Sequence, residues 1–355
     1  MKKKAFHIAF ATGLKRDLRY LAALVHSIVE NFSRPESLTF HVLHFYLTAE
    51  DLEPLHQSLE YLPCSVQYYA LDDIAGEALS KPCFGYWGRV WVPRVLDDSI
   101  DRVLYLDCDM ICHRDLSCLW ALDLGENFVA AVLDPGTRTL GVSQSLAESA
   151  PEYGYDFPSD GNYFNSGLLF MNLRAWRDER VLETLERKFD YRPQRFNDQD
   201  ALNLLFQGRV VYVSPEWNLV ESIYLYEEWD FALYESYGSP VHYMQPRLRH
   251  YSGEMKPDGL YVRESEAEDF YYYLDRTVWR GWRSEISSRW YRPVLGNLLD
   301  FHYVMVRGFK QKALEKPWTR LREIAKKAPY VLVLYPFLGV YRAYRRVRDF
   351  ASRSL

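Results

Sequence analysis

The chain contains the stretch RVLYLDCDMI at residues 102–111, its clearest structural signal. Val103 to Leu106 form an apolar run without polar alternation, which is typical of a strand buried on both faces of a parallel sheet. The run stops at Asp107, so this residue and Asp109 are expected at the carboxyl end of the strand, the edge of an open α/β sheet where ligands bind. Because residues two apart on a strand point to the same side, both aspartates can face one ligand.

Two carboxylates placed this close repel each other unless a cation lies between them. A hard divalent ion with oxygen ligands meets this need and can in turn hold a phosphate. The alternative is that an aspartate at a strand end only caps the following turn. A D-x-D triplet is short, so it does not choose between these interpretations without its surroundings.

The segments before this stretch alternate between strand and helix patterns. Strands are expected over residues 5–11, 38–47 and 65–70, and helices over 18–32 and 49–61. This β-α-β-α-β order predicts the parallel sheet of a nucleotide-binding half, with right-handed crossovers. His41 and His44 lie in the second strand, where we expect them to be core histidines with satisfied hydrogen bonds.

Polar residues also follow or interrupt the later apolar segments. A strand over residues 128–133 ends at Asp134, which places a further carboxylate at the same edge of the sheet. The run NYFNSGLLFMNL, residues 162–173, reads as a strand with a polar step at Asn165, Ser166 and Gly167. That step indicates either close approach of a hydroxyl-rich ligand or a β-bulge.

Two amphipathic helices are expected next, over residues 174–189 and 197–206. The second opens with Asn197-Asp198-Gln199-Asp200, and acidic residues in a first helical turn are explained by the helix dipole alone. A role in chemistry is compatible with that explanation.

Two cations and a histidine stand out against their neighbours. Arg89 interrupts an apolar run, so it needs an anion, either a structural carboxylate or a ligand phosphate. The segment HYSGEMKP, residues 250–257, is expected to be a loop because of Gly253 and Pro257. His250 can offer a neutral imidazole to a metal ion, and Lys256 can reach a diphosphate as a point charge.

Composition is that of a globular protein with 355 residues, 48% hydrophobic and 26% charged. The length suits one large α/β domain with an appendage, or two domains. The odd set of five cysteines fits free thiols in a reducing compartment. The aromatic residues, 28 Tyr, 19 Phe and 10 Trp, suit flat ligands such as sugar rings, although most aromatic residues are simply core.

The charge is distributed unevenly along the chain. Residues 280–355 carry 17 Lys and Arg against 5 Asp and Glu and are rich in aromatic residues. We therefore expect a catalytic domain over residues 1–279 and a basic, aromatic-rich helical tail over 280–355 that lies on an anionic membrane surface, rather than on nucleic acid. Its longest apolar run falls short of the ~20 residues of a spanning helix. The alternatives are a basic helical subdomain or an oligomer contact.

Five motifs in this order resemble those of glycosyltransferase family 8, retaining enzymes that use nucleotide sugars and include bacterial lipopolysaccharide galactosyl- and glucosyltransferases. They are YWGRV around Arg89, VLYLDCDMI, FNSGLLFMNL, NDQDALN and HYSGEMKP. The resemblance spans residues 5 to 257. It implies a GT-A fold, in which a Rossmann-like, mostly parallel central sheet is flanked by helices.

The resemblance also implies an activity. A hexose, glucose or galactose, would pass from a UDP-sugar to a saccharide or glycolipid acceptor, in synthesis of lipopolysaccharide or another cell-surface glycan. Mn²⁺ would be the cofactor, with Mg²⁺ as the second choice. The protein would work in the cytoplasm, on the inner face of the cytoplasmic membrane.

Roles of single residues follow from the matched motifs. Metal ligands are implied at Asp107, Asp109 and His250. Nucleotide-sugar contacts are implied at Ala11, Thr12, Arg89, Cys108, Asp134, Asn165, Ser166, Asp198, Gly253 and Lys256. Gln199, together with Asp198, matches the catalytic position opposite the leaving group; because an amide is a poor nucleophile, it would stabilise an oxocarbenium-like centre rather than form a bond.

Two departures from the family pattern bear on substrate choice. Family members usually carry an acid just after the first strand, where Thr12 and Gly13 stand here, and Asp17 is the candidate for a displaced substitute. Many members follow Lys-Pro with Trp, whereas this chain has Asp258, on the acceptor side.

Two rival functions share some of these features. Haloacid-dehalogenase-like phosphatases also have a strand followed by D-x-D, but Gly-Thr or Gly-Val usually comes next, whereas Met110 and Ile111 follow here. A sugar-binding or inactive relative would keep the fold without turnover. The intact metal and diphosphate residues favour an active enzyme.

Overall fold

The computed structural model describes residues 5–75, 87–134, 150–156, 162–189, 198–220, 246–253, 256–259 and 264–284. For Ala75 and residues 264–266 only the backbone is described. The tail predicted over residues 280–355 lies outside these ranges except for its first five positions, so its predicted helices are not part of the description that follows.

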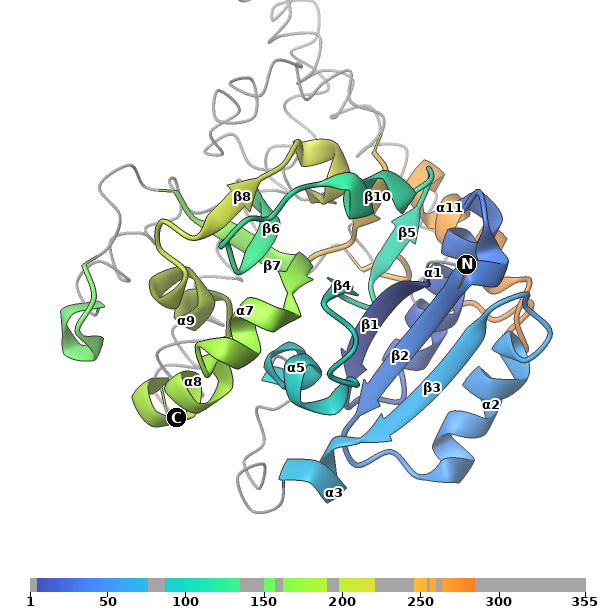
Figure 1. The fold of residues 1–355 in the computed structure, drawn as a ribbon. Helices are drawn as coiled ribbons and strands as arrows, with labels where there is room; N and C mark the ends of the chain where they lie inside the picture. The colour runs from blue at the N-terminus through green and yellow to red at the C-terminus, as the bar shows by residue number, and fades with distance from the viewer. Residues whose placement is uncertain are drawn as a thin grey trace, which may run out of the picture.

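A seven-stranded sheet forms the centre of the described protein (Figure 1). In spatial order its strands are β3 (Ser65–Ala70), β2 (Leu38–His44), β1 (Phe6–Thr12), β4 (Arg102–Leu106), β7 (Phe164–Asn172), β6 (Val129–Leu133) and β8 (Val210–Tyr212). Strand β7 runs antiparallel to both β4 and β6, and the other neighbouring pairs are parallel. The prediction of a mostly parallel sheet is confirmed.

Helices cover both faces of this sheet. The α-helices are α1 (Asp17–Asn31), α2 (Ala49–Leu59), α3 (Leu71–Ala75), α5 (Val92–Val95), α7 (Leu173–Asp178), α8 (Val181–Phe189), α9 (Asp198–Leu205) and α11 (Glu264–Leu274). Short 3₁₀ helices cover Pro35–Ser37, Gly88–Trp91, Ser117–Ala121, Ala150–Tyr153 and Pro215–Trp217.

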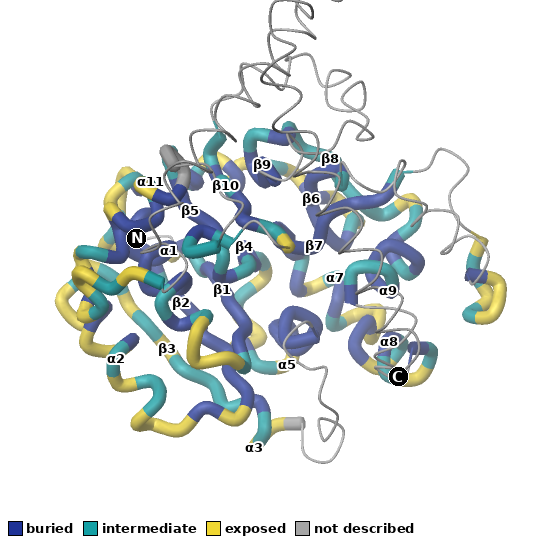
Figure 2. The backbone as a smooth tube through the Cα atoms, turned by 180° about the vertical axis from the view of Figure 1, so that it is seen from behind, coloured by how far each residue is buried: buried dark blue, intermediate teal, exposed yellow. Residues whose placement is uncertain are grey.

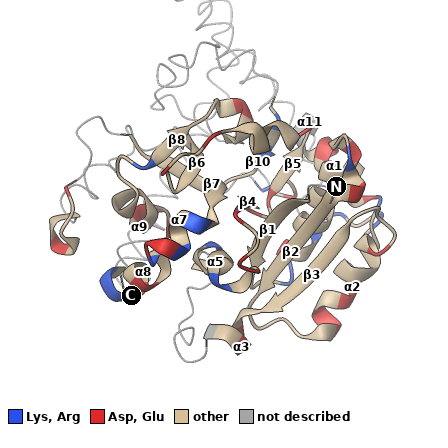
Figure 3. Cartoon of the chain, viewed as in Figure 1, with Lys and Arg blue, Asp and Glu red and all other residues tan. Residues whose placement is uncertain are grey.

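Alternation along the strands creates two separate cores. Ile8 and Phe10 of β1 pack with α1, α2 and α11, whereas Ala9 and Ala11 pack with α5, α7, α8 and α9 on the other face. Figure 2 shows the buried strands in the centre and exposed residues on the outer helices. Figure 3 shows that most charged residues lie on helices and connecting segments rather than on the strands. The carboxyl ends of the strands are therefore the natural place for the charged residues of a site.

One predicted helix is wrong. The segment expected to be a single helix over residues 174–189 forms two helices, α7 and α8, because Arg180 between them has a positive φ of 52°. A residue in the left-handed region cannot continue a right-handed helix. The helical spacing of apolar residues continues across this break, so the pattern contained no sign of it.

The two core histidines differ. The ring nitrogens of His41 lie 3.0 Å from Nδ1 of His7 and 3.0 Å from the hydroxyl of Tyr69, as expected of a satisfied core residue. Nδ1 of His44 is buried without a hydrogen-bond partner among the described residues, so the same prediction is wrong for His44.

A second, three-stranded sheet joins distant parts of the chain next to strand β4. It contains β5 (Met110–Cys112), β10 (Leu248–His250) and β9 (Leu219–Val220). Strand β10 is antiparallel to β5, with His250 opposite Met110, and parallel to β9. His250 is thus the last residue of a strand and not, as predicted, part of a loop. This small sheet carries it to the end of β4.

The polar step in β7 coincides with an irregularity in the main sheet. Ala130 of β6 pairs with Phe170, but Val132 pairs with Asn165, so the register shifts between them. This register shift is a β-bulge or a comparable irregularity, which agrees with the β-bulge interpretation, whereas a ligand at this step stays a prediction. The shift leaves Ser166 and Gly167 outside the regular pairing with β6.

Two further sequence predictions concern thiols and membranes. The cysteines in the described ranges, Cys64, Cys108, Cys112 and Cys118, are free thiols. Among the described helices, none combines the length and the apolar character that crossing a bilayer requires.

Candidate active site

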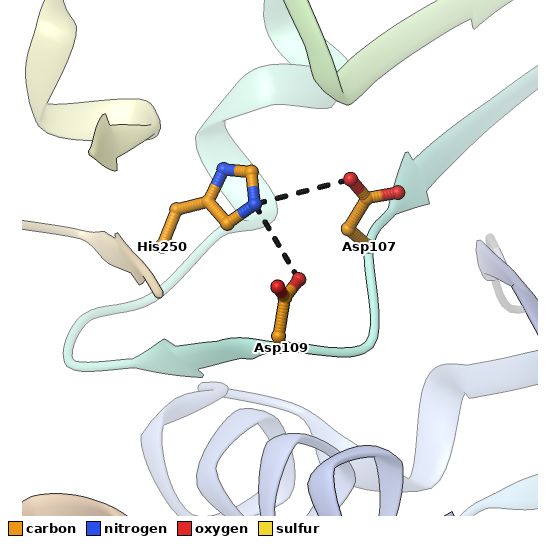
Figure 4. A group of neighbouring side chains, drawn as sticks. All are labelled: Asp107, Asp109 and His250. Carbon is orange, nitrogen blue, oxygen red and sulfur yellow. Dashed lines mark ion pairs between the residues drawn. The ribbon is translucent and has the colours of Figure 1, made fainter. Parts of the chain in front are cut away.

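Two aspartates and one histidine converge at the carboxyl end of β4 (Figure 4). Nε2 of His250 lies 3.4 Å from Oδ1 of Asp109 and 3.9 Å from Oδ2 of Asp107. One ligand atom from each residue lies within 4.8 Å of the other two. Backbone hydrogen bonds hold the arrangement, since the N–H of Asp107 donates to the carbonyl of Gly167 and the N–H of Tyr251 donates to the carbonyl of Asp109.

These donors fit a divalent cation such as Mn²⁺. Two carboxylate oxygens and one imidazole nitrogen form a mixed oxygen and nitrogen set, which first-row divalent ions accept. Burial opposes ionisation of Asp109, yet the pKa of its carboxyl lies below the ordinary value, and the neighbouring positive charge of Lys256 is the largest effect that lowers it. The carboxyl of Asp109 is therefore ionised at neutral pH.

Lys256 returns to the acidic pair from the loop that follows β10. Its ammonium group forms an ion pair with the carboxylate of Asp109. Burial lowers the pKa of Lys256, but Asp109 and the other acids nearby outweigh burial and raise it. Gly253, in the same loop, has a φ of +64°, a conformation that favours glycine, and no atom of the described residues lies within 4 Å of a Cβ added there. Gly253 thus lets the loop turn back.

Arg89 joins two parts of the site. Its Nη2 lies 3.0 Å from Oδ1 of Asp107 and its Nε lies 2.8 Å from Oδ2 of Asp198. Nη1 donates to the carbonyl of Ser166, and the guanidinium lies 4.9 Å from the ring centre of Tyr105. The sequence predicted an anionic partner for Arg89, either a carboxylate or a ligand phosphate. In this structure the partners are two carboxylates of the chain itself.

A polar network extends from this arginine across β7 and α9. Oγ of Ser166 donates to Oδ2 of Asp198, 3.2 Å away, and the N–H of Ser166 donates to Oε1 of Gln199, 2.9 Å away. Nδ2 of Asn165 and Nε2 of Gln199 both donate to Oδ2 of Asp134, at 2.9 and 3.3 Å. The structure thus brings the predicted residues of three separate motifs together.

Of the predicted nucleotide-sugar contacts, Ala11 and Thr12 lie at the end of β1, and Cys108 lies beside Ala11. Sγ of Cys108 donates to the carbonyl of Ala11 at 3.6 Å, and Oγ1 of Thr12 lies 3.4 Å from Oδ2 of Asp17. Burial raises the pKa of Asp17, and the charge of Asp109 raises it further. Asp17 therefore interacts electrostatically with Asp109 of the acidic pair.

Comparison with known proteins establishes the family. The protein-family model described as glycosyl transferase family 8 matches residues 7–257. The chain belongs to glycosyltransferase family 8. This family 8 chain is 23% identical over 270 residues to General stress protein A of Bacillus subtilis, which covers 74% of this chain and 90% of that protein. It is 26% identical over 290 residues to a lipopolysaccharide 1,2-glucosyltransferase of Escherichia coli, with 79% and 80% covered.

A solved structure of galactosyltransferase LgtC, in complex with donor and acceptor sugar analogs, is similar to this glycosyltransferase. The TM-score is 0.58 at 26% identity, and the likeness covers 78% of this chain and 99% of that one. The predicted GT-A class of the described part is thereby confirmed. The family match gives no support to the phosphatase alternative.

Some residues of this family 8 site were missed in the sequence. Asn218 is fully buried, and its Oδ1 lies 2.9 Å from Nδ1 of His250. The hydroxyl of Tyr105 donates to Oδ1 of Asp107 at 3.2 Å, and that of Tyr163 donates to Asp200. The only local signal for Asn218 was an amide directly before two apolar residues, which is too common to single it out.

Proposed function

We propose that this family 8 glycosyltransferase moves glucose or galactose from a UDP-sugar to a saccharide or glycolipid acceptor, with retention at the anomeric carbon. The product would be part of lipopolysaccharide or another cell-surface glycan. The observation that carries the proposal is the meeting of Asp107, Asp109, His250 and Lys256 at the carboxyl end of β4. The E. coli relative, a lipopolysaccharide 1,2-glucosyltransferase, and the galactosyltransferase LgtC support the choice of hexose and acceptor.

In this proposal, Asp107, Asp109 and His250 hold Mn²⁺, or Mg²⁺ in its place. A bound divalent cation supplies charge stabilisation for the departing diphosphate. Lys256 contributes a second positive charge beside the same carboxylates, at the place where negative charge develops on the leaving group.

The transfer exchanges one bond for another at the anomeric carbon. The bond from this carbon to the phosphate oxygen breaks, and a bond to the acceptor oxygen forms. The hydroxyl proton of the acceptor passes to the departing phosphate, so UDP leaves as the second product. Retention requires that the acceptor enters on the face that UDP leaves.

Gln199 and Asp198 are the proposed catalytic residues on the opposite face. The amide of Gln199 is oriented because its carbonyl accepts the N–H of Ser166 and its NH₂ group donates to Asp134. An oriented amide dipole can stabilise positive charge at the anomeric carbon without forming a covalent bond.

The remaining predicted residues are proposed to bind the donor. Arg89 would act through Asp107 and Asp198, because both carboxylates already hold its guanidinium. The other residues are assigned to the three parts of the donor. Ala11, Thr12 and Cys108 would contact the nucleoside, and Gly253 and Lys256 would contact the diphosphate. The sugar would be bound by Asp134, Asn165, Ser166 and Asp198.

Release of UDP from UDP-glucose and UDP-galactose, measured with the full chain and Mn²⁺, tests the proposal. Asp109→Ala should lower kcat/KM about 1,000-fold, since several kcal/mol of charge stabilisation would be lost. Asp123→Ala, on an exposed turn, is the matched control. Unchanged transfer by Asp109→Ala would refute the proposed site. Phosphate release from simple phosphoesters without a sugar donor would favour a phosphatase, and no turnover of any donor would favour an inactive relative.

We also propose that residues 1–279 form the catalytic domain and that residues 280–355 attach it to the inner face of the cytoplasmic membrane. The excess of Lys and Arg in the second segment supports this, at ~1 kcal/mol for each charge near an anionic surface. The full chain should sediment with anionic vesicles at low salt, and deletion of residues 281–355 should abolish this. Equal sedimentation of both proteins would refute the attachment.

A further inference from the structure

We propose that Asn218 is a positioning residue that determines which ring nitrogen of His250 faces the two aspartates. The proposal rests on the metal site of the proposed function. Both side chains are buried, with 0% of Asn218 and 3% of His250 exposed. Oδ1 of Asn218 lies 2.9 Å from Nδ1 of His250, on the side of the ring away from Asp107 and Asp109.

The hydrogen-bond directions follow from a single backbone group. The N–H of Gly167 can only donate, and it points at a side-chain atom of Asn165 at 2.9 Å, so that atom is the carbonyl oxygen. The Asn218 atom that lies 2.8 Å from the same oxygen must therefore be its NH₂ group. The other amide atom of Asn218 is then the oxygen.

That oxygen determines the state of the imidazole. Because Oδ1 of Asn218 can only accept, Nδ1 of His250 must carry a hydrogen. In the neutral ring, Nε2 then keeps its lone pair, and Nε2 is the nitrogen that faces Asp109 at 3.4 Å. His250 is thus held in the tautomer that a metal ligand needs.

The NH₂ group of Asn165 fixes the direction of these hydrogen bonds. Nδ2 of Asn165 donates to Oδ2 of Asp134, a carboxylate that cannot exchange roles with it while ionised. Rotating the amide of Asn165 by half a turn would place an oxygen against that carboxylate and an NH₂ group against the N–H of Gly167. The same oxygen of Asp134 accepts from Gln199. One network therefore links the proposed metal ligand to the proposed sugar contacts.

Packing holds the imidazole in place as well. A Cβ added at Gly167 would lie 2.9 Å from Nδ1 of His250 and 2.9 Å from Oδ1 of Asn165, closer than real Cβ atoms approach. The ring therefore lies directly against bare backbone. Together the amide and the backbone restrict both the plane of the ring and the position of its proton.

The structure of the free protein offers a direct test. We would record ¹⁵N–¹H correlation spectra of the histidine rings in the full chain without metal, at alkaline pH where the rings carry one proton. Comparison with His250→Gln identifies the His250 signals. We expect the hydrogen on Nδ1 of His250, and a hydrogen on Nε2 would overturn the proposal. This experiment needs no substitution of Asn218.

Two variants test the consequence for metal binding. Partners that orient a metal-binding histidine are typically worth 10-fold to 100-fold in affinity. Asn218→Ala should therefore weaken Mn²⁺ binding, followed by electron paramagnetic resonance, by about 10-fold to 100-fold.

Asn172→Ala is the matched control. Asn172 lies at the other end of β7, and its side chain caps α7, so the change perturbs the same strand without touching His250. Equal Mn²⁺ affinity in Asn218→Ala and the wild type would overturn the proposal. None of these measurements uses a sugar donor, so a failure of sugar transfer remains distinguishable from a failure of the positioning role.

Discussion

Nε of Arg89 lies 2.8 Å from Oδ2 of Asp198, and both side chains are almost completely buried. Burial raises the pKa of Asp198 to about 6, although Arg89 acts in the opposite direction. The same guanidinium also holds Asp107 at 3.0 Å. A single cation thus connects the carboxylate proposed for the metal to the one proposed for the sugar.

Removal of this cation should destabilise the fold. Arg89→Met leaves the buried carboxylate of Asp198 and the partly buried carboxylate of Asp107 without their partner, so the free energy of unfolding in guanidinium chloride should fall by about 3–5 kcal/mol. Arg94→Met, on an exposed position of α5, should change it by less than about 0.5 kcal/mol. The double variant Arg89→Met/Asp198→Asn should cost less than the sum of the single variants, and strict additivity would contradict the pairing.

Lys256 should matter for binding of the nucleotide. Lys256→Met removes the ammonium group beside Asp109, and charged hydrogen bonds of this kind contribute about 1.5–3 kcal/mol. The affinity for UDP in the presence of Mn²⁺, measured by isothermal titration calorimetry, should fall about 10-fold to 100-fold. Lys188→Met, which removes an ammonium that contacts the ring of Tyr155 and the carbonyl of Tyr153, is the control. Equal UDP affinity in Lys256→Met and the wild type would rule out the diphosphate role.

Gly167 should tolerate no side chain. Gly167→Ala pushes a methyl group against His250 and Asn165, so we expect a loss of about 1–3 kcal/mol in the free energy of unfolding in urea. Mn²⁺ binding should weaken in the same variant. At Gly13 the nearest atom to an added Cβ is 3.5 Å away, an ordinary contact, so Gly13→Ala serves as the stability control. A Gly167→Ala protein as stable as Gly13→Ala would show that the ring does not need the bare backbone.

Asp200 should make stability depend on pH. Burial raises its pKa from 3.8 to about 6, so between these values the folded protein keeps a proton that the unfolded chain has released. Stability from this group therefore falls as the pH rises from about 4 to 6. Asp200→Asn does not titrate, and its stability relative to wild type should rise across that window by up to about 3 kcal/mol and stay level above it. Unfolding curves at several pH values check this, and a constant difference would contradict it.

Most of the strands and helices were predictable from local patterns. The apolar run before Asp107 predicted a buried central strand and a ligand-binding edge, and both the strand and its place in the sheet agree with the structure. Such patterns succeed because a buried face places apolar residues at every second position of a strand and at about every fourth position of a helix. The break at Arg180 was not predictable, since the apolar spacing runs through it and only the backbone angle differs.

The site was predictable in part. The ligand-like residues Asp107, Asp109 and His250 were found because their side chains have few common roles at such positions and because the motifs resemble a known family. The bonds of Arg89 were left open between a carboxylate and a phosphate. Asn218 was missed because its two partners, His250 and Asn165, lie 32 and 53 residues away in the chain, and an amide has no distinctive pattern.

The amino-acid sequence was sufficient to specify the order of strands and helices, the acidic edge of the sheet and the family, since each depends on residue types at short spacing. The meeting of His250 with the aspartates, the division of Arg89 between two carboxylates, and the tautomer of His250 depend on strand pairing and on buried hydrogen bonds between distant segments. Those contacts exist only after the chain has folded, because the direction of a hydrogen bond is a property of the assembled network and not of any one residue.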